Sequence, residues 1–132
     1  MSPLNGLEVL LVGGSGGLGS ASAELLATEG AKAIISSRSH GIRADITCAT
    51  DRERLLDAVP NFYGLVVFAG NPARGAGEDM YQLSHQVNYE GPILLARAAA
   101  ERMKARRVSG AIVLFSTMQA VALFPGSSVY AG

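Results

Sequence analysis

The sequence predicts an α/β domain in which helices cover both faces of a doubly wound parallel sheet. The chain has 132 residues and 16 glycines, and it is 48% hydrophobic but only 6% aromatic, with no Trp. Its core must therefore be built from Val, Ile, Leu and Ala, as in strands that are buried on both faces. Apolar runs of strand length alternate with helical stretches, which predicts parallel strands joined by right-handed crossovers. The length fits one domain over residues 1–132.

The first strand and the first helix flank a glycine-rich turn. Residues 7–13 form a continuous apolar run bounded by glycine, which predicts a buried strand. A helix is expected over residues 17–30, with Gly30 suited to end it. The apolar face of this predicted helix carries Leu18, Ala21, Leu25 and Leu26.

The remaining elements continue the alternation. Further strands are expected over residues 31–37, 41–45, 63–70 and 110–117. The segment between Ser37 and Gly41 has no room for a helix, so that connection is abbreviated. A brief helix is expected over residues 50–59, with Thr50 and Asp51 as candidate caps. One long helical region is expected over residues 77–107, interrupted at Gly91-Pro92.

Composition excludes several classes of protein. Lys plus Arg and Asp plus Glu both number 11, so net charge offers no case for binding nucleic acid or an anionic membrane. A single cysteine, Cys48, cannot form an internal disulfide, which fits a reducing compartment. No signal peptide or bilayer-length apolar run is visible, and no Cys, His and carboxylate set has the spacing of metal ligands. We expect a cytoplasmic protein with no metal.

The turn "VGGSGGLG" stands between a predicted strand and a predicted helix, where a dinucleotide fingerprint belongs. Glycines let the backbone approach a pyrophosphate, and the helix N-terminus offers free N–H groups and a positive dipole end. Gly13, Gly17 and Gly19 fit one known spacing, whereas Gly13, Gly16 and Gly19 fit another. The glycines alone leave both open.

Two residues at the end of the second predicted strand indicate the cofactor. A carboxylate at this point would bind the adenosine ribose and repel a 2′-phosphate. The chain instead has Ser37, which can donate a hydrogen bond, and Arg38, which can form charge-assisted bonds to phosphate. The pair favours NADP(H) over NAD(H), and Arg43 is a weaker candidate for the same phosphate.

At this point the chain resembles the short-chain dehydrogenase/reductase family, through essentially its whole length and in the right order. "VGGSGGLG" is similar to the family's T-G-x-x-x-G-x-G turn, with Val12 in place of Thr. "VVFAG" is similar to N-N-A-G, although Val67 and Phe68 replace both Asn. "ADIT", "VNYEG" and "GAIVLFST…SSVY" are similar to three further segments of the family. The resemblance implies a Rossmann-type sheet with strand order 3-2-1-4-5 and a compact member of the family.

The resemblance also implies the site residues. The cofactor-binding set is Gly13, Ser15, Gly16, Gly17, Leu18, Gly19, Ser37, Arg38, Asp45, Ile46, Ala69 and Gly70. Within it, Asp45 and Ile46 edge the adenine, and Ala69 and Gly70 neighbour the nicotinamide ribose. Tyr130 is the implied acid/base, Asn88 belongs to a proton relay, and Thr117 stands where the family has its catalytic Ser.

The chemistry of hydride transfer to a carbonyl explains these residue types. Charge develops on the oxygen, and a Tyr130 hydroxyl can supply the matching proton. Thr117 can orient the carbonyl, and Ser116 is the alternative. Adjacent strand residues face opposite ways, so only one of the two can point at the substrate. Pro92 has no N–H and leaves the Asn88 carbonyl without its helical partner, so that carbonyl can hold a water.

The family's Lys comes four residues after its Tyr, which would be position 134. We therefore expect a longer chain; the alternatives are a complementary C-terminal fragment supplied by a second chain and an inactive remnant. Five strands of an expected seven would leave the fifth as an open apolar edge. The resemblance also implies a homodimer or homotetramer.

The predicted function is hydride transfer between NADPH and a small-molecule carbonyl or alcohol substrate. Two alternatives remain open at this stage. One is a non-catalytic NADP(H)-binding sensor or scaffold. The other is an epimerase or dehydratase of the related fold, which the second glycine spacing permits.

Overall fold

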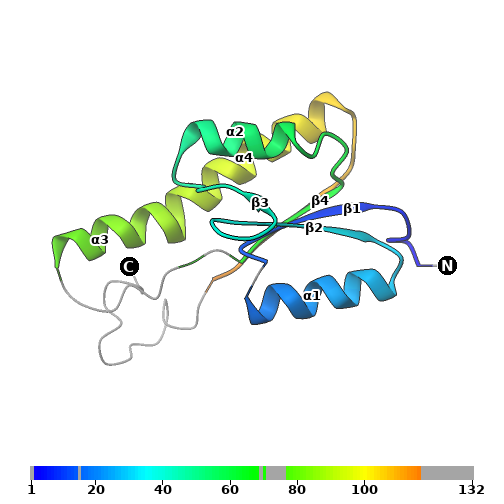
Figure 1. Cartoon of the computed structure of the whole chain (residues 1–132). Helices are drawn as coiled ribbons and strands as arrows, with labels where there is room; N and C mark the ends of the chain where they lie inside the picture. The colour runs from blue at the N-terminus through cyan, green and yellow to red at the C-terminus, as the bar shows by residue number, and fades with distance from the viewer. Residues whose placement is uncertain (1, 15, 69, 71–76, 117–132) are drawn as a thin grey trace.

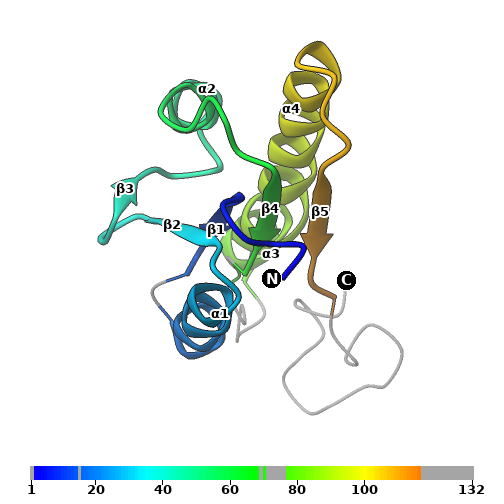
Figure 2. The same ribbon diagram turned by 90° about the vertical axis from the view of Figure 1, so that its right-hand side faces the viewer.

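The computed structural model describes residues 2–14, 16–68, 70 and 77–116. They form a five-stranded parallel sheet with the order β3-β2-β1-β4-β5, as predicted (Figures 1 and 2). The strands are β1 (Glu8–Val12), β2 (Lys32–Ser37), β3 (Ile42–Arg43), β4 (Gly64–Val67) and β5 (Ala111–Leu114). The helices are α1 (Gly17–Thr28), α2 (Ala49–Asp57), α3 (Glu78–Ser84), the π-helix η1 (His85–Glu90) and α4 (Gly91–Ala105).

The helices lie in two layers, one on each face of the sheet. Helix α1 covers one face, whereas α2, α3 and α4 lie on the other (Figures 1 and 2). The chain moves outward from β1 to β2 and β3, and then returns across the sheet to β4 and β5. Because right-handed crossovers in opposite directions place their helices on opposite faces, this order produces a three-layer domain.

The core lies between the sheet and the layer of α2 and α4. Strands β1 and β4 are central, and their side chains are almost fully buried. The core cluster is Leu10, Val12, Ala44, Ile46, Leu55, Leu56, Val59, Phe62, Leu65, Val67, Leu95, Ala99 and Met103. Nearly all of it is aliphatic, as the composition requires. Among the described strands β5 is at the edge, and its Val113 and Leu114 are exposed, as expected for an open apolar edge.

Helix α1 ends as predicted but buries a different face. Gly30 has a φ of 77°, and its N–H donates to Ala27 while that of Ala31 donates to Leu26, which is a Schellman ending. The predicted apolar face is wrong for Leu18 and Leu25, which are both 68% exposed, and for Ala21, which is also exposed; of the four predicted residues only Leu26 lies on the less exposed side. The sheet side instead carries the less exposed residues Gly19, Ser22, Ala23 and Leu26. Small residues there allow the helix to approach the strands closely.

Helix α2 begins one residue earlier than expected, and neither predicted cap acts as one. Its N-cap is Cys48, which makes no side-chain capping bond. The Asp51 carboxylate accepts a hydrogen bond from the backbone N–H of Asp45 instead, at 2.8 Å. The residue therefore joins α2 to the loop before it.

The long helical region of residues 77–107 is interrupted as the sequence indicates. The interruption is the π-helix η1, in which the Gly91 N–H donates to the carbonyl of Gln86, five residues earlier. Pro92 follows directly and cannot donate a backbone hydrogen bond, which accounts for a break in the regular helix at this point.

Candidate functional site

A cavity of about 430 Å³ lies at the carboxyl ends of β1 to β4, where the strand order reverses. This is the place where open α/β sheets bind ligands. Its walls come from the glycine turn, the β2–β3 turn, the loop after β3, the end of β4 and the α3–η1 helix. The lining residues are Val12, Gly13, Gly16, Ser37, Arg38, Ala44, Asp45, Ile46, Thr47, Phe68, Gly70, Leu83, Gln86 and Val87.

The glycine turn has the close packing that a phosphate-binding turn needs. Gly13 has a φ of 79°, a conformation that side chains disfavour. A Cβ on Gly19 would lie against the backbone of Gly14, so the start of α1 depends on a glycine there. At Gly17 the same atom would meet nothing within 4 Å, and at Gly16 only a carbonyl at that limit. The open backbone of both leaves room for a ligand, and the two spacings share Gly13 and Gly19.

Among the residues that the structure describes, no side chain caps the N-terminus of α1. Its N-cap is Gly16, which makes no side-chain capping bond, and no acidic residue stands in the first turn. The first N–H groups of the helix and its positive dipole end are therefore available to a negatively charged group. Gly16 lines the cavity, so that group would lie inside it.

The β2–β3 turn holds Ser37 differently from the sequence expectation. Its hydroxyl donates to the carbonyl of His40 at 3.0 Å and accepts from the N–H groups of Ser39 and His40. A hydroxyl has one donor and two lone pairs, so all its bonds are used within the turn. Ser37 lines the cavity, but its hydroxyl donates within the turn and not into the cavity. Arg38 follows it and lines the cavity too.

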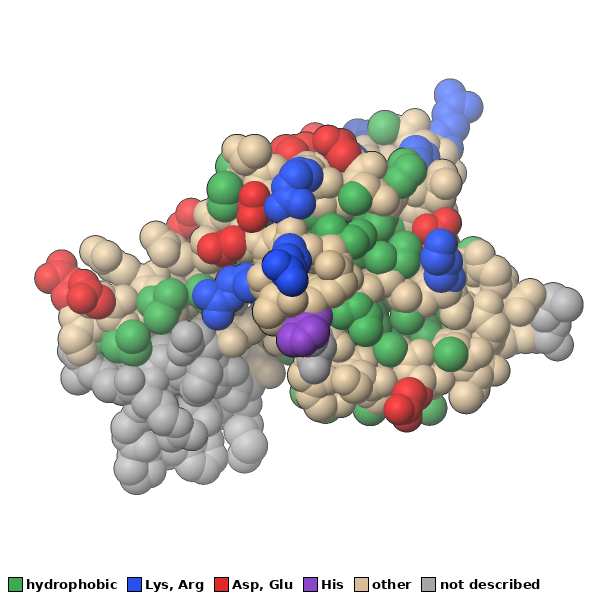
Figure 3. Space-filling view, in the orientation of Figure 1, with side chains coloured by type: hydrophobic (Ala, Val, Ile, Leu, Met, Phe, Trp, Pro, Cys, Tyr) green, Lys and Arg blue, Asp and Glu red, His purple; other side chains and the backbone are tan. Residues whose placement is uncertain are grey.

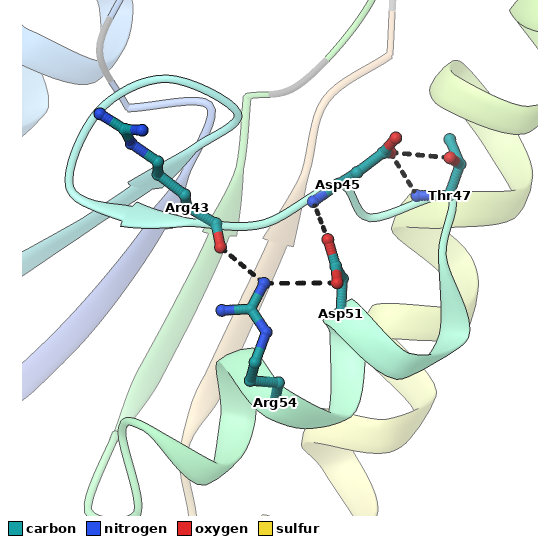
Figure 4. A network of polar contacts seen from close by, with 5 residues as sticks. All are labelled: Arg43, Asp45, Thr47, Asp51 and Arg54. Carbon is teal, nitrogen blue, oxygen red and sulfur yellow. Dashed lines mark hydrogen bonds and ion pairs between the residues drawn. The ribbon is translucent and has the colours of Figure 1, made fainter.

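The loop after β3 is held by a network of polar contacts (Figure 4). Asp51 accepts from the Asp45 N–H, and Asp45 in turn accepts from the backbone and hydroxyl of Thr47, at 3.0 and 2.7 Å. Arg54 donates to the Arg43 carbonyl at 2.8 Å and pairs with Asp51 at 3.3 Å. The Asp45 N–H, with Arg54 beside it, holds the pKa of Asp51 below its usual value. Three strand-end residues, Asp45, Ile46 and Thr47, are thereby fixed along the cavity wall.

The α3–η1 helix closes the cavity from the other side. A Cβ on Gly91 would lie 3.1 Å from the Ile46 carbonyl oxygen, so the helix passes close over the Asp45–Thr47 loop. Asn88 is half-buried, and its amide nitrogen is 3.2 Å from the Ser84 hydroxyl. A Cβ on Gly70 would lie 3.2 Å from the Asn88 side-chain oxygen. The structure thus brings Asn88 to the end of β4.

The remaining predicted site residues divide into two groups. Leu18 is exposed and Gly19 buried on α1, while Ser116 is exposed just after β5. Ser15, Ala69, Thr117 and Tyr130 lie outside the described residues. Within the described part of the chain, no group of His, Cys, Asp and Glu could hold a metal ion. The helices found there are too short or too polar to cross a membrane.

The sequence reasoning missed part of the cavity wall. Thr47, Leu83, Gln86 and Val87 line it, and Phe68 lines it while stacking on Phe115 with ring centroids 5.0 Å apart. Thr47 carries a signal, because it follows Asp45 by two residues and can bond back to it. Gln86 and Val87 carry no such signal, since their position at the cavity depends on how a helix distant in the sequence crosses the sheet.

Comparisons with known proteins give relatives of one kind. No protein-family model matches the chain. Human dehydrogenase/reductase SDR family member 4 is 26% identical over 155 residues, an alignment that covers 97% of this chain and 55% of the human protein. The chain spans 52% to 59% of the length of the curated relatives that it matches.

Solved structures agree in fold. A short-chain dehydrogenase/reductase family protein is 31% identical with a TM-score of 0.88, covering 97% of this chain and 62% of that one. Ligand-free aldohexose dehydrogenase from Thermoplasma acidophilum is 26% identical with a TM-score of 0.88, covering 98% and 56%. The sheet order, the glycine turn, the cavity at the strand ends and these relatives together lead to one conclusion: the chain is similar, over nearly its whole length, to proteins of the short-chain dehydrogenase/reductase family.

Proposed function

We propose that this protein is an NADP(H)-dependent oxidoreductase that transfers hydride between NADPH and a small carbonyl or alcohol substrate. One observation carries the proposal. The cavity joins the glycine turn, Arg38 and the Asp45–Thr47 loop in a single space. These are the groups that a pyrophosphate, a 2′-phosphate and an adenine would each require.

The described residues fit such a cofactor. The uncapped N-terminus of α1 and the open backbone at Gly16 and Gly17 suit the pyrophosphate. Arg38 is exposed at the cavity edge, where basic side chains and a histidine gather over the β2–β3 turn (Figure 3). No carboxylate stands on that turn to repel a phosphate. Ala69 and Gly70 are assigned to the nicotinamide end, with Asn88 beside Gly70.

In this proposal the bound nicotinamide supplies or accepts the hydride, and the chain supplies the proton and the orientation. Tyr130 donates the proton to the substrate oxygen, and Thr117 or Ser116 orients that oxygen with a hydrogen bond. Asn88 holds a water for the proton relay. A cytoplasmic homodimer or homotetramer belongs to the same proposal.

The cofactor is tested with Arg38→Ala. Loss of a charge-assisted bond to the 2′-phosphate should weaken NADPH binding about 10-fold or more and leave NADH binding nearly unchanged. Isothermal titration of both cofactors against the wild type and the variant measures this. Lys104→Ala, an exposed cation at the far end of α4, controls for net charge. An Arg38→Ala protein with undiminished preference for NADPH contradicts the proposed cofactor.

A second candidate function, a non-catalytic NADP(H) sensor, is favoured by one observation. Phe68 stands where the family has a polar Asn, and it lines the cavity and packs on Phe115. Tyr130→Phe separates the two functions. In the enzyme the variant should lose turnover by about 100-fold or more while NADPH affinity is kept. Turnover measured with a panel of carbonyl substrates and NADPH decides, and absent turnover in the wild type favours the sensor.

A further inference from the structure

We infer that Ser37 is a positioning residue for cofactor selection: its hydroxyl locks the β2–β3 turn and thereby sets where Arg38 stands. The inference rests on the proposed function, in which Arg38 binds the 2′-phosphate. It differs from the sequence expectation that Ser37 itself donates to that phosphate. Ser37 and Arg38 line the same cavity, so their location does not distinguish binding of the phosphate from positioning of Arg38. The hydrogen bonds of each side chain distinguish these two roles.

The Ser37 hydroxyl makes three hydrogen bonds within the turn. It accepts from the His40 N–H at 2.8 Å and from the Ser39 N–H at 3.2 Å, and it donates to the His40 carbonyl at 3.0 Å. The backbone N–H of Ser37 donates to the same carbonyl at 3.1 Å. A phosphate could receive the hydroxyl proton only if the bond to His40 were broken, which would loosen the turn.

The other end of the turn is held by a glycine. Gly41 has a φ of 66°, and a Cβ there would overlap the carbonyl oxygen of Ile35. The next contact is made by Ala44, whose N–H donates to the Ser37 carbonyl at 3.0 Å. The backbone at Arg38 is therefore held on both sides, at Ser37 and at Gly41. This short connection has no room for a crossover helix, and these contacts fix it instead.

Arg38 gains from a fixed backbone because its own side chain is not held. It is exposed, and no ion pair or hydrogen bond joins it to another described residue. A long side chain must lose rotamer freedom when it binds a phosphate, so a rigid base limits what has to be ordered. Ser37 supplies that base through the backbone of residues 38–40.

The test compares Ser37→Ala with Ser39→Ala in the whole protein. Ser39 is a matched control, because it lies in the same turn and its hydroxyl contacts only the ring of His40, at 2.8 Å, among the described residues. Ser37→Ala should lower the ratio of NADPH to NADH affinity about 3- to 10-fold, and Ser39→Ala should leave it within about 2-fold. Ser37→Thr keeps the hydroxyl and should restore most of the ratio. Unchanged NADH binding shows that each variant is folded.

A double-mutant cycle with Arg38→Ala separates positioning from direct contact. If Ser37 acts through Arg38, Ser37→Ala should add almost nothing to the loss of NADPH preference in the Arg38→Ala background. Additive losses would mean that Ser37 binds the phosphate itself and would overturn the inference. A normal ratio in Ser37→Ala, with the ratio lost in Arg38→Ala, would also overturn it and leave the proposed function intact. If Arg38→Ala keeps the preference for NADPH over NADH, the proposed cofactor itself is contradicted, and with it the inference about Ser37.

Discussion

Gly19 illustrates how much a single residue controls in this fold. The start of α1 lies so close to the glycine turn that a Cβ at position 19 would overlap the backbone of Gly14. Gly14 is confined as well, since its own Cβ would lie 2.9 Å from that of Leu11. The glycines therefore do two different jobs: Gly14 and Gly19 permit close packing, and Gly16 and Gly17 keep a space open.

Gly19→Ala should destabilise the protein by about 1–3 kcal/mol, because the helix or the turn has to shift to admit the methyl group. Gly17→Ala is the control, since its methyl group meets nothing within 4 Å and alanine favours a helix. Free energies of unfolding in urea measure both. A Gly17→Ala protein that loses as much stability as Gly19→Ala would contradict this division of roles.

The sequence predicted the position of a residue where that position depends on the backbone alone. The positions of Gly13 and Arg38 followed from their place after a strand, and both line the cavity. The sequence was less informative where a polar side chain can choose between partners. The sequence predicts that Ser37 donates to the phosphate, but its hydroxyl bonds three backbone groups within its own turn.

At the scale of elements, α2 acts as a brace for the cavity wall. Asp51, Arg52 and Arg54 each hold backbone of the segment before the helix: the Asp45 N–H, the Ile46 carbonyl and the Arg43 carbonyl. The adenine side of the proposed site is therefore set by a helix whose own side chains do not line it. In the proposed site the adenine is common to NADPH and NADH, whereas the 2′-phosphate assigned to Arg38 is present only in NADPH.

Asp51→Asn should weaken NADPH and NADH binding by the same factor, about 2- to 5-fold, because it loosens the loop that we propose as the adenine contact. The ratio of the two affinities should not change. Titration of both cofactors measures this, with Glu24→Gln on exposed α1 as the control for a lost charge. A change in the ratio would mean that the loop contributes to 2′-phosphate selection.

The same residue predicts a dependence on pH. The pKa of Asp51 is lowered in the folded protein, first by the Asp45 N–H and then by Arg54, so its ionised form favours the folded state. This contribution is complete above the unfolded pKa of about 4 and is lost as the pH falls through the lower folded value. The urea midpoint of the wild type should exceed that of Asp51→Asn at pH 7, and the two should converge below about pH 4. A gap that persists at low pH would show that the carboxylate charge is not involved.

The helices show where periodicity is informative. The break before Pro92 follows from a missing N–H, and the structure has a π-helix there. The buried face of α1 could not be read from its leucines, because the sheet packs against the smaller side of the helix.

For the whole molecule, the cavity depends on bringing four strand ends and one helix together. Arg102 contributes by joining α4 to α2, with Glu53 and Asp57 both at 2.7 Å. Partial burial of Arg102 lowers its pKa, but the bonds to Asp57 and Glu53 outweigh that effect and raise it overall. Arg106 adds a second link, with its guanidinium over the Phe62 ring and bonded to the Phe62 carbonyl. Within one layer, the helical region that carries Gln86 and Val87 is thereby joined to α2, the helix that braces the Asp45 loop.

The sequence by itself determined the order of the elements, the glycine turn, the abbreviated β2–β3 connection and the place of Arg38. Each depends on residue types within a few positions along the chain, where local sterics and periodicity decide. Only the tertiary structure decided which face of α1 is buried, what the Ser37 hydroxyl bonds, and how Gln86 and Asn88 reach the ends of the strands. Those outcomes depend on distances between segments far apart in the chain, which are set by the packing of helices across the sheet.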